Sequence, residues 1–101
     1  MAGDKIEVNY DELQRSAKIF ESEAENIKNL HNRLRSQVEN LHGGGWIGTA
    51  SDTFHREMEE EVLIRISRLY HAMEMSSDIL RRITDMFQQA EDEASGLFKQ
   101  G

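Results

Sequence analysis

The chain has 101 residues and a net charge of −7, and it contains neither cysteine nor proline. This length indicates a single domain over residues 1–101, and the missing cysteines exclude a disulfide scaffold or a thiolate metal cluster. The negative charge repels phosphate backbones, and no face gathers enough Lys or Arg to reverse it, so nucleic acid is excluded as a partner.

The sequence also argues against a membrane anchor and a cleaved leader. No apolar run approaches the roughly 18 residues of a transmembrane helix, so no stable membrane span is expected. The opening segment, MAGDKIEV, lacks the basic and apolar blocks of a signal peptide. If the protein is exported, we expect a route without a cleaved leader.

The first predicted helix covers about residues 10–42. Asn9 and Glu12 have the spacing of a capping box at its start. Apolar side chains then recur in alternating steps of four and three, the spacing of a stripe that faces a partner helix. The stripe consists of Leu13, Ala17, Phe20, Ala24, Ile27, His31, Leu34, Val38 and Leu41. We interpret its one polar member, His31, as a core histidine or a pH-sensitive layer.

A glycine-rich segment at residues 43–48 interrupts this pattern. Four of the seven glycines and the only tryptophan lie in it. Because glycine disfavours helix, the sequence predicts one bend between two long helices, with Trp46 at its tip. The indole can plug the open end of the hairpin, form a recognition surface, or do both. Gly48 would supply a backbone angle that larger residues resist.

The second predicted helix covers about residues 49–95 and is followed by a flexible tail at 96–101. Thr49 and Asp52 have the spacing of another capping box. The predicted contact stripe opens in steps of four, which indicates a locally changed winding, and then alternates between four and three. It consists of Ala50, Phe54, Met58, Val62, Ile66, Leu69, Met73, Ser76, Leu80, Ile83, Phe87, Ala90 and Ala94.

A second apolar stripe follows the same helix, about 100° around it from the first. A two-helix hairpin has no third element to cover such a surface. We therefore expect a dimer contact formed by Ile64, Met75, Ile79 and Met86. The predicted fold class is all-α, an antiparallel two-helix hairpin that dimerises into a four-helix bundle.

Trp46, Ile47 and Gly48 stand between two long helices, near the middle of a chain of about a hundred residues. In this placement the chain resembles the WXG family, the ESAT-like small helical hairpins exported by bacterial type VII secretion. The resemblance covers the whole chain. It implies dimers and recognition by the secretion ATPase. We expect a homodimer, with a paralogue heterodimer as the alternative.

A second resemblance to this family lies 41 residues beyond Trp46, in the segment 87–91 with sequence FQQAE. The family's tail motif has an aromatic residue, an acid four positions on, and spaced apolar residues. The matching positions are Phe87, Glu91, Ala94 and Phe98. Phe87 keeps the ring of the family's usual tyrosine and lacks its hydroxyl. The two motifs lie roughly 60 Å apart along a helix, so an antiparallel dimer would set each tail near the other chain's bend.

Two acid-x-x-His pairs flank the bend, Glu39 with His42 and Asp52 with His55. Such pairs occur in the carboxylate metal sites of helical bundles. Here they lie beside the predicted stripes, and no further inward acid completes a site. We expect no metal and no cofactor.

The sequence shows no nucleophile with its base, no phosphate-binding loop and no paired inward carboxylates, so we interpret the protein as a non-enzyme. The predicted function is a type VII secretion substrate, secreted without a cleaved signal peptide. It would act as a helical dimer, or as a carrier or chaperone for a larger partner. The alternatives are a cytoplasmic helical adaptor that is not exported and a metal-binding helical bundle.

Overall fold

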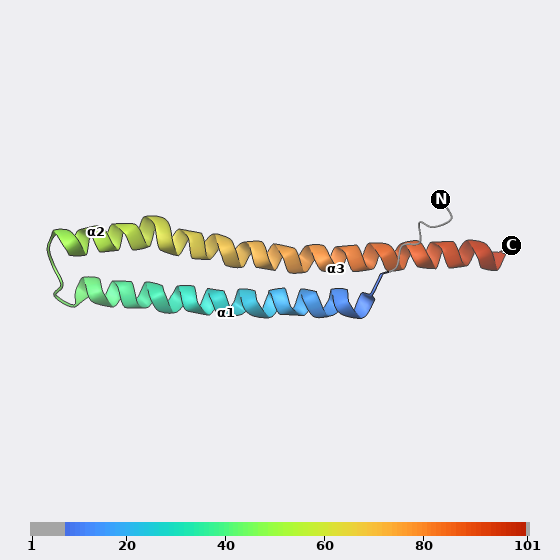
Figure 1. Cartoon of the computed structure of the whole chain (residues 1–101), viewed down its shortest axis with the longest axis horizontal. Coiled ribbons are helices and arrows are strands. Elements are labelled where there is room, and N and C mark those ends of the chain that lie inside the picture. The colour runs from blue at the N-terminus through green and yellow to red at the C-terminus, as the bar shows by residue number, and fades with distance from the viewer. Residues whose placement is uncertain (1–7, 101) are drawn as a thin grey trace.

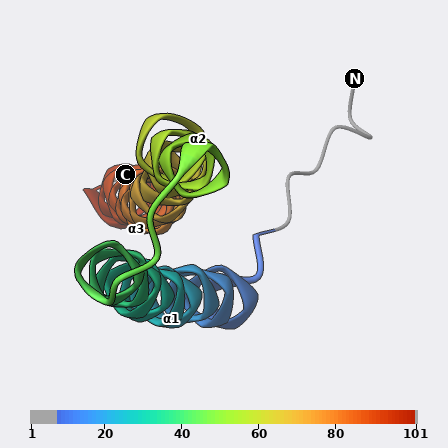
Figure 2. The same ribbon diagram turned by 90° about the vertical axis from the view of Figure 1, so that its left-hand side faces the viewer.

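The computed structural model describes the backbone of residues 8–100 and the side chains of residues 8–96. The elements in chain order are helix α1 (Tyr10–Gly43), helix α2 (Thr49–Glu57), the π-helical turn η1 (Met58–Val62) and helix α3 (Leu63–Gln100). The last three continue into one another as a single arm that runs antiparallel to α1 (Figure 1). Figure 2 shows the two arms side by side, with no third layer over the described residues. The all-α hairpin is therefore confirmed.

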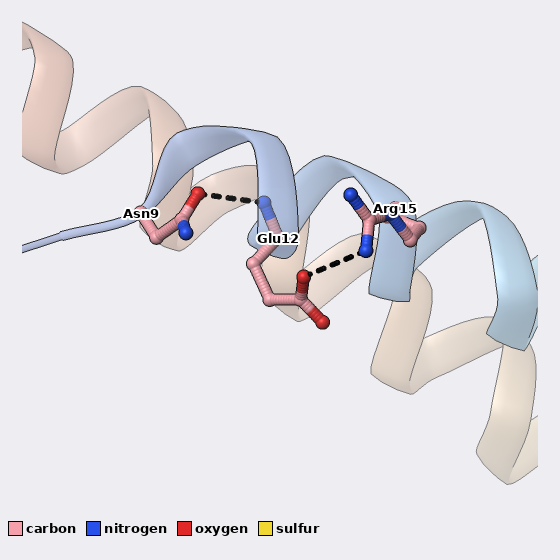
Figure 3. Close-up of polar contacts among 3 residues, drawn as sticks. All are labelled: Asn9, Glu12 and Arg15. Atoms are coloured by element: carbon pink, nitrogen blue, oxygen red, sulfur yellow. Dashed lines mark hydrogen bonds and ion pairs between the residues drawn. The ribbon is translucent and has the colours of Figure 1, made fainter.

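The first turn of α1 is capped at the predicted residue. Asn9 Oδ1 accepts a hydrogen bond from the backbone amide of Glu12 at 3.0 Å, which satisfies one of the free amides of the first turn (Figure 3). The Glu12 carboxylate accepts from Arg15 at 3.0 Å instead of completing a capping box. Half of the predicted box therefore forms.

Small side chains bring the two arms together. The buried residues of this kind include Ala17, Ala24, Ser77 and Thr84. Ser77 Oγ donates a buried hydrogen bond to the carbonyl oxygen of Ala17 at 2.9 Å. At the surface, Arg81 forms an ion pair with Glu21 across the same arms. These two contacts fix the antiparallel register.

The turn η1 provides the changed winding that the steps of four predict. Beyond Met58 the predicted stripe is confirmed at Ile66, Met73 and Leu80. At the positions between them it is wrong by one residue. The amide of Leu63 bonds to the carbonyl of Met58, five residues earlier. The extra residue in this turn brings Leu63 toward α1. Leu63 is 7% exposed, whereas Val62 is 38% and Leu69 51% exposed.

Beyond η1 the observed contact stripe alternates between steps of three and four without a slip. It consists of Leu63, Ile66, Tyr70, Met73, Ser77, Leu80 and Thr84. Steps of this kind keep one narrow face of a helix on its partner. The inserted residue has therefore moved the stripe by one position relative to Val62 and Leu69.

The C-terminal part of α3 extends beyond α1 (Figure 1). α1 begins at Tyr10, which the interhelical hydrogen bond places about level with Thr84. Residues 85–95 are exposed, and we call them the overhang. Three positions of the predicted contact stripe fall in it: Phe87, Ala90 and Ala94. They have no α1 residues opposite them, so their assignment to the interface within the chain is wrong.

Helix α3 ends later than the predicted second helix. Its backbone is helical to Gln100, whereas the sequence places the end at about residue 95. Gly101 lies outside the described residues, and the flexibility of residues 96–101 stays a prediction. Gly96 lowers helix stability by about 1 kcal/mol relative to alanine, and no proline follows it to stop the helix. The hairpin is a thin rod of 78 × 24 × 16 Å. None of its described helices has the combination of length and apolar character that crossing a membrane requires.

Candidate functional site

Three glycines shape the bend, each for a physical reason. A Cβ at Gly44 would lie 2.8 Å from the carbonyl oxygen of Asn40, too close for any side chain. Gly45 and Gly48 have φ angles of 89° and 124°, in the region that favours glycine. Gly48, not Thr49, is the N-cap of α2, and it has no side-chain cap. The predicted capping box at Thr49 therefore does not form.

Trp46 is held against α2 by its ring and by its backbone. The indole centroid lies 5.3 Å from that of Phe54 and 5.9 Å from that of His55. The carbonyl oxygen of Trp46 accepts a hydrogen bond from Ser51 Oγ at 2.9 Å. His42, in the last turn of α1, packs edge to face on His55, and their ring centroids are 4.6 Å apart. We call the four rings of His42, Trp46, Phe54 and His55 the tip cluster.

The tip cluster is packed on one side and open on the other. His55 is 6% exposed, Trp46 is 40% exposed and Ile47, beside it, is 85% exposed. The indole therefore closes the end of the hairpin and also offers a surface to a partner. Its role in recognition stays a prediction.

The two acid-x-x-His pairs meet at the bend through their histidines. His42 and His55 are in contact as aromatic rings, and both ring nitrogens of His55 are buried without a hydrogen-bond partner in the described part of the chain. Among the described residues, no three or more His, Asp and Glu side chains are grouped to hold a metal ion. The contacts of His55 are those of a packed ring.

The tail motif lies on the overhang of α3. Phe87, Glu91 and Ala94 are all exposed to solvent. The side chain of Phe98 lies outside the described part of the chain. The overhang and the bend are at opposite ends of the 78 Å rod (Figure 1). One chain therefore cannot bring the two motifs together, as the helical rise predicts.

Tyr10 lies beside the tail motif, although no sequence motif marks it. Its hydroxyl is buried and has no hydrogen-bond partner among the described residues. Burial raises the pKa of Tyr10, and the nearby carboxylates of Glu91 and Asp92 raise it further. The Glu91 carboxylate therefore lies near the hydroxyl without accepting a hydrogen bond from it. Only the register of the arms reveals this proximity.

The second apolar stripe of the second arm is exposed along α3. Met75 and Met86 are 62% and 68% exposed, and Ile64 and Ile79 are also exposed. Within the described chain nothing covers these four side chains. The predicted dimer contact is therefore accessible, and its use in a dimer remains a prediction.

The comparisons with known proteins address the bend directly. A family model described as WXG100, proteins of 100 residues with WXG, matches residues 5–92. This range contains the tip cluster and the start of the tail motif. No match is found among curated proteins or among solved structures. Proteins of the matched family are small helical proteins associated with type VII secretion. With Trp46 and Gly48 at the bend between two helical arms and a match over most of its length, the chain belongs to the WXG100 family.

Proposed function

We propose that the protein is a small substrate of a bacterial type VII secretion system and is exported without a cleaved signal peptide. The family match over residues 5–92 carries this proposal. Members of the family are secretion substrates and are not known as enzymes, so we assign no catalytic residues. The bend supports the proposal, because it leaves Trp46 and the neighbouring Ile47 exposed at the tip of the hairpin.

The exported form is a helical dimer, or a complex with a larger partner that the hairpin carries. The exposed stripe on α3 supports this assignment: Ile64, Met75, Ile79 and Met86. Covering apolar surface contributes about 25 cal/mol per Å², and residues 8–100 form no third layer that could cover it. We propose a homodimer, with a paralogue heterodimer as the alternative.

The proposed export surface has two parts, and the secretion ATPase is its proposed receptor. The bend contributes Trp46 and Gly48. The tail contributes Phe87, Glu91, Ala94 and Phe98. Since the two parts lie at opposite ends of a rod of 78 Å, an antiparallel dimer would bring the bend of one chain toward the tail of the other.

Replacing Trp46 with alanine tests the bend. We expect Trp46→Ala to abolish export and to leave helix content nearly unchanged, because the ring contacts only the tip. Export is measured by fractionating cells with and without the secretion ATPase, and helix content by circular dichroism. Gly43→Ala is the matched control, since Gly43 belongs to α1 and a Cβ there meets nothing within 4 Å.

Each result of this test has a distinct meaning. Wild-type protein in the medium only when the ATPase is present supports the proposal. Wild-type protein that stays in the cytoplasm of both strains supports the adaptor instead. If Trp46→Ala also removes the cooperative melting transition, the ring is chiefly structural and its proposed recognition role is wrong.

A further inference from the structure

We propose that Tyr10 is part of the tail surface, so that the start of α1 and the overhang of α3 form one composite export surface. This inference rests on the proposed function and extends it. The tail motif of the sequence lies entirely on the second arm, in Phe87, Glu91 and the residues that follow. Tyr10 adds a side chain from the other arm.

The backbone places Tyr10 close to Glu91. Tyr10 is the first residue of α1, and the Asn9 cap fixes this first turn (Figure 3). The Ser77–Ala17 bond sets the register, which leaves Tyr10 about two turns, or roughly 10 Å, short of Glu91 along the axis.

Helical side chains lean toward the N-terminus of their own helix. In antiparallel arms these directions oppose each other. The side chain of Tyr10 therefore leans toward the overhang, and that of Glu91 leans back toward Tyr10.

The chemistry of the two groups is complementary. A buried hydroxyl normally has a hydrogen-bond partner, and the Tyr10 hydroxyl has none among the described residues. The exposed Glu91 side chain can rotate to accept a hydrogen bond from it. The phenol is protonated at neutral pH and can donate, because its ordinary pKa is about 10, and burial and the neighbouring carboxylates raise that pKa further.

This contact makes Tyr10 a positioning residue. A bond from its hydroxyl would hold the Glu91 carboxylate at a fixed place relative to the Phe87 ring, one helical turn away. A partner would then meet an aromatic edge and a negative charge in constant geometry, which suits an apolar pocket next to a cation. The other tyrosine, Tyr70, lies in the middle of the hairpin, where its ring centroid is 5.8 Å from that of His31.

The pairing is tested by ultraviolet titration of the full chain carrying Tyr70→Phe, in which Tyr10 is the only tyrosine left to titrate. We expect a raised pKa for Tyr10 that moves back toward the ordinary value in Glu91→Gln. Glu93→Gln, which removes an exposed charge two residues further on, is the control and should change it little. If Glu91→Gln leaves the pKa of Tyr10 where it was, the two groups are not paired and the inference is wrong.

The effect on export is measured in the same cells as for Trp46. We expect Tyr10→Phe, which keeps the ring, to slow export by about 2- to 10-fold, the factor that one ordinary hydrogen bond supplies. Glu91→Gln should slow export at least as much, and adding Tyr10→Phe to it should have no further effect. Tyr70→Phe is the control and should be exported like wild type.

The outcomes separate this inference from the proposed function. Wild-type export of Tyr10→Phe, together with failure of Glu91→Gln, overturns the inference and leaves the proposed function standing. Absence of export for the wild-type chain overturns the proposed function. It overturns the export role of Tyr10 with it, while the titration still decides whether Tyr10 and Glu91 are paired.

Discussion

The glycines of the bend follow one another closely in the sequence, yet the structure gives them different tasks. Gly43 is a helical residue with open space around its Cβ position. Gly45 and Gly48 have positive φ angles. A side chain in such a conformation costs about 1–3 kcal/mol. In the Trp-x-Gly motif, Trp46 thus acts through its ring, and Gly48 acts through its backbone conformation.

Alanine substitutions should separate these tasks. We expect Gly45→Ala and Gly48→Ala each to lower the free energy of unfolding by about 1–3 kcal/mol. Gly43→Ala should raise it by up to about 1 kcal/mol, because alanine loses less backbone freedom on folding. Urea unfolding at one fixed protein concentration measures the three values. Equal values for all three variants would contradict the backbone constraint at the bend.

The turn η1 has the arrangement of a single inserted residue within an otherwise regular helix. Met58 and Leu63 both face α1, although they are five residues apart. Deleting Glu60, which is exposed, would leave them four apart and restore α-helical spacing. We expect this deletion to keep helix content and the cooperative melting transition. Circular dichroism during heating measures both.

Deleting Glu74 is the matched control for this prediction. Glu74 is also exposed, and it lies within the regular part of α3. Its loss would rotate Ser77 and all later contact residues by about 100° away from α1, so we expect the melting transition to be lost or strongly lowered. Similar damage from the two deletions would show that η1 is not an inserted residue but a required part of the interface.

The elements differ in how far the sequence predicts them. Spacing alone predicts α1, the bend and the hairpin, because long apolar periodicity and clustered glycines act locally. Beyond Met58 the stripe of the second arm is predicted correctly at Ile66, Met73 and Leu80. It is wrong by one residue at the positions between them, since apolar spacing favours Leu69 whereas the inserted residue turns Tyr70 inward. The same shift explains Ser77: the spacing favours Ser76, whereas the folded hairpin buries Ser77.

In the candidate site, too, the sequence predicts local features better than contacts between the arms. The motif identifies Trp46 and Gly48 directly, because they are neighbours in the chain. The sequence identifies His42 and His55 only as members of possible metal pairs, and it does not mark Tyr10. Their actual contacts appear only in the folded hairpin, since they form across the bend or between the two arms. Sequence spacing on one helix contains no information on that register.

At the scale of the whole molecule, the exposed stripe on α3 predicts a homodimer. We expect the double variant Ile79→Glu and Met86→Glu to dissociate or unfold it, because burying unpaired charges costs several kcal/mol. Sedimentation velocity at micromolar concentration measures the mass. Ile19→Glu is the matched control, since Ile19 is also an exposed apolar residue but lies on α1.

The control should remain a dimer with wild-type helix content. A wild-type chain that sediments as a stable, helical monomer at micromolar concentration would show that the stripe does not hold two copies together. The stripe would then remain uncovered until another partner binds.

The antiparallel register also determines the order in which the arms can come together. The hydrogen bond between Ser51 and Trp46 joins residues five apart, whereas that between Ser77 and Ala17 joins residues 60 apart. Closing the longer loop first carries an additional entropic cost of about 2 kcal/mol, so we expect the arms to zip from the bend toward the free end. The contact of Tyr10 with the overhang then forms last. A receptor that reads Tyr10 together with Glu91 would therefore respond only to chains that have finished folding, and export would follow folding without a separate checkpoint.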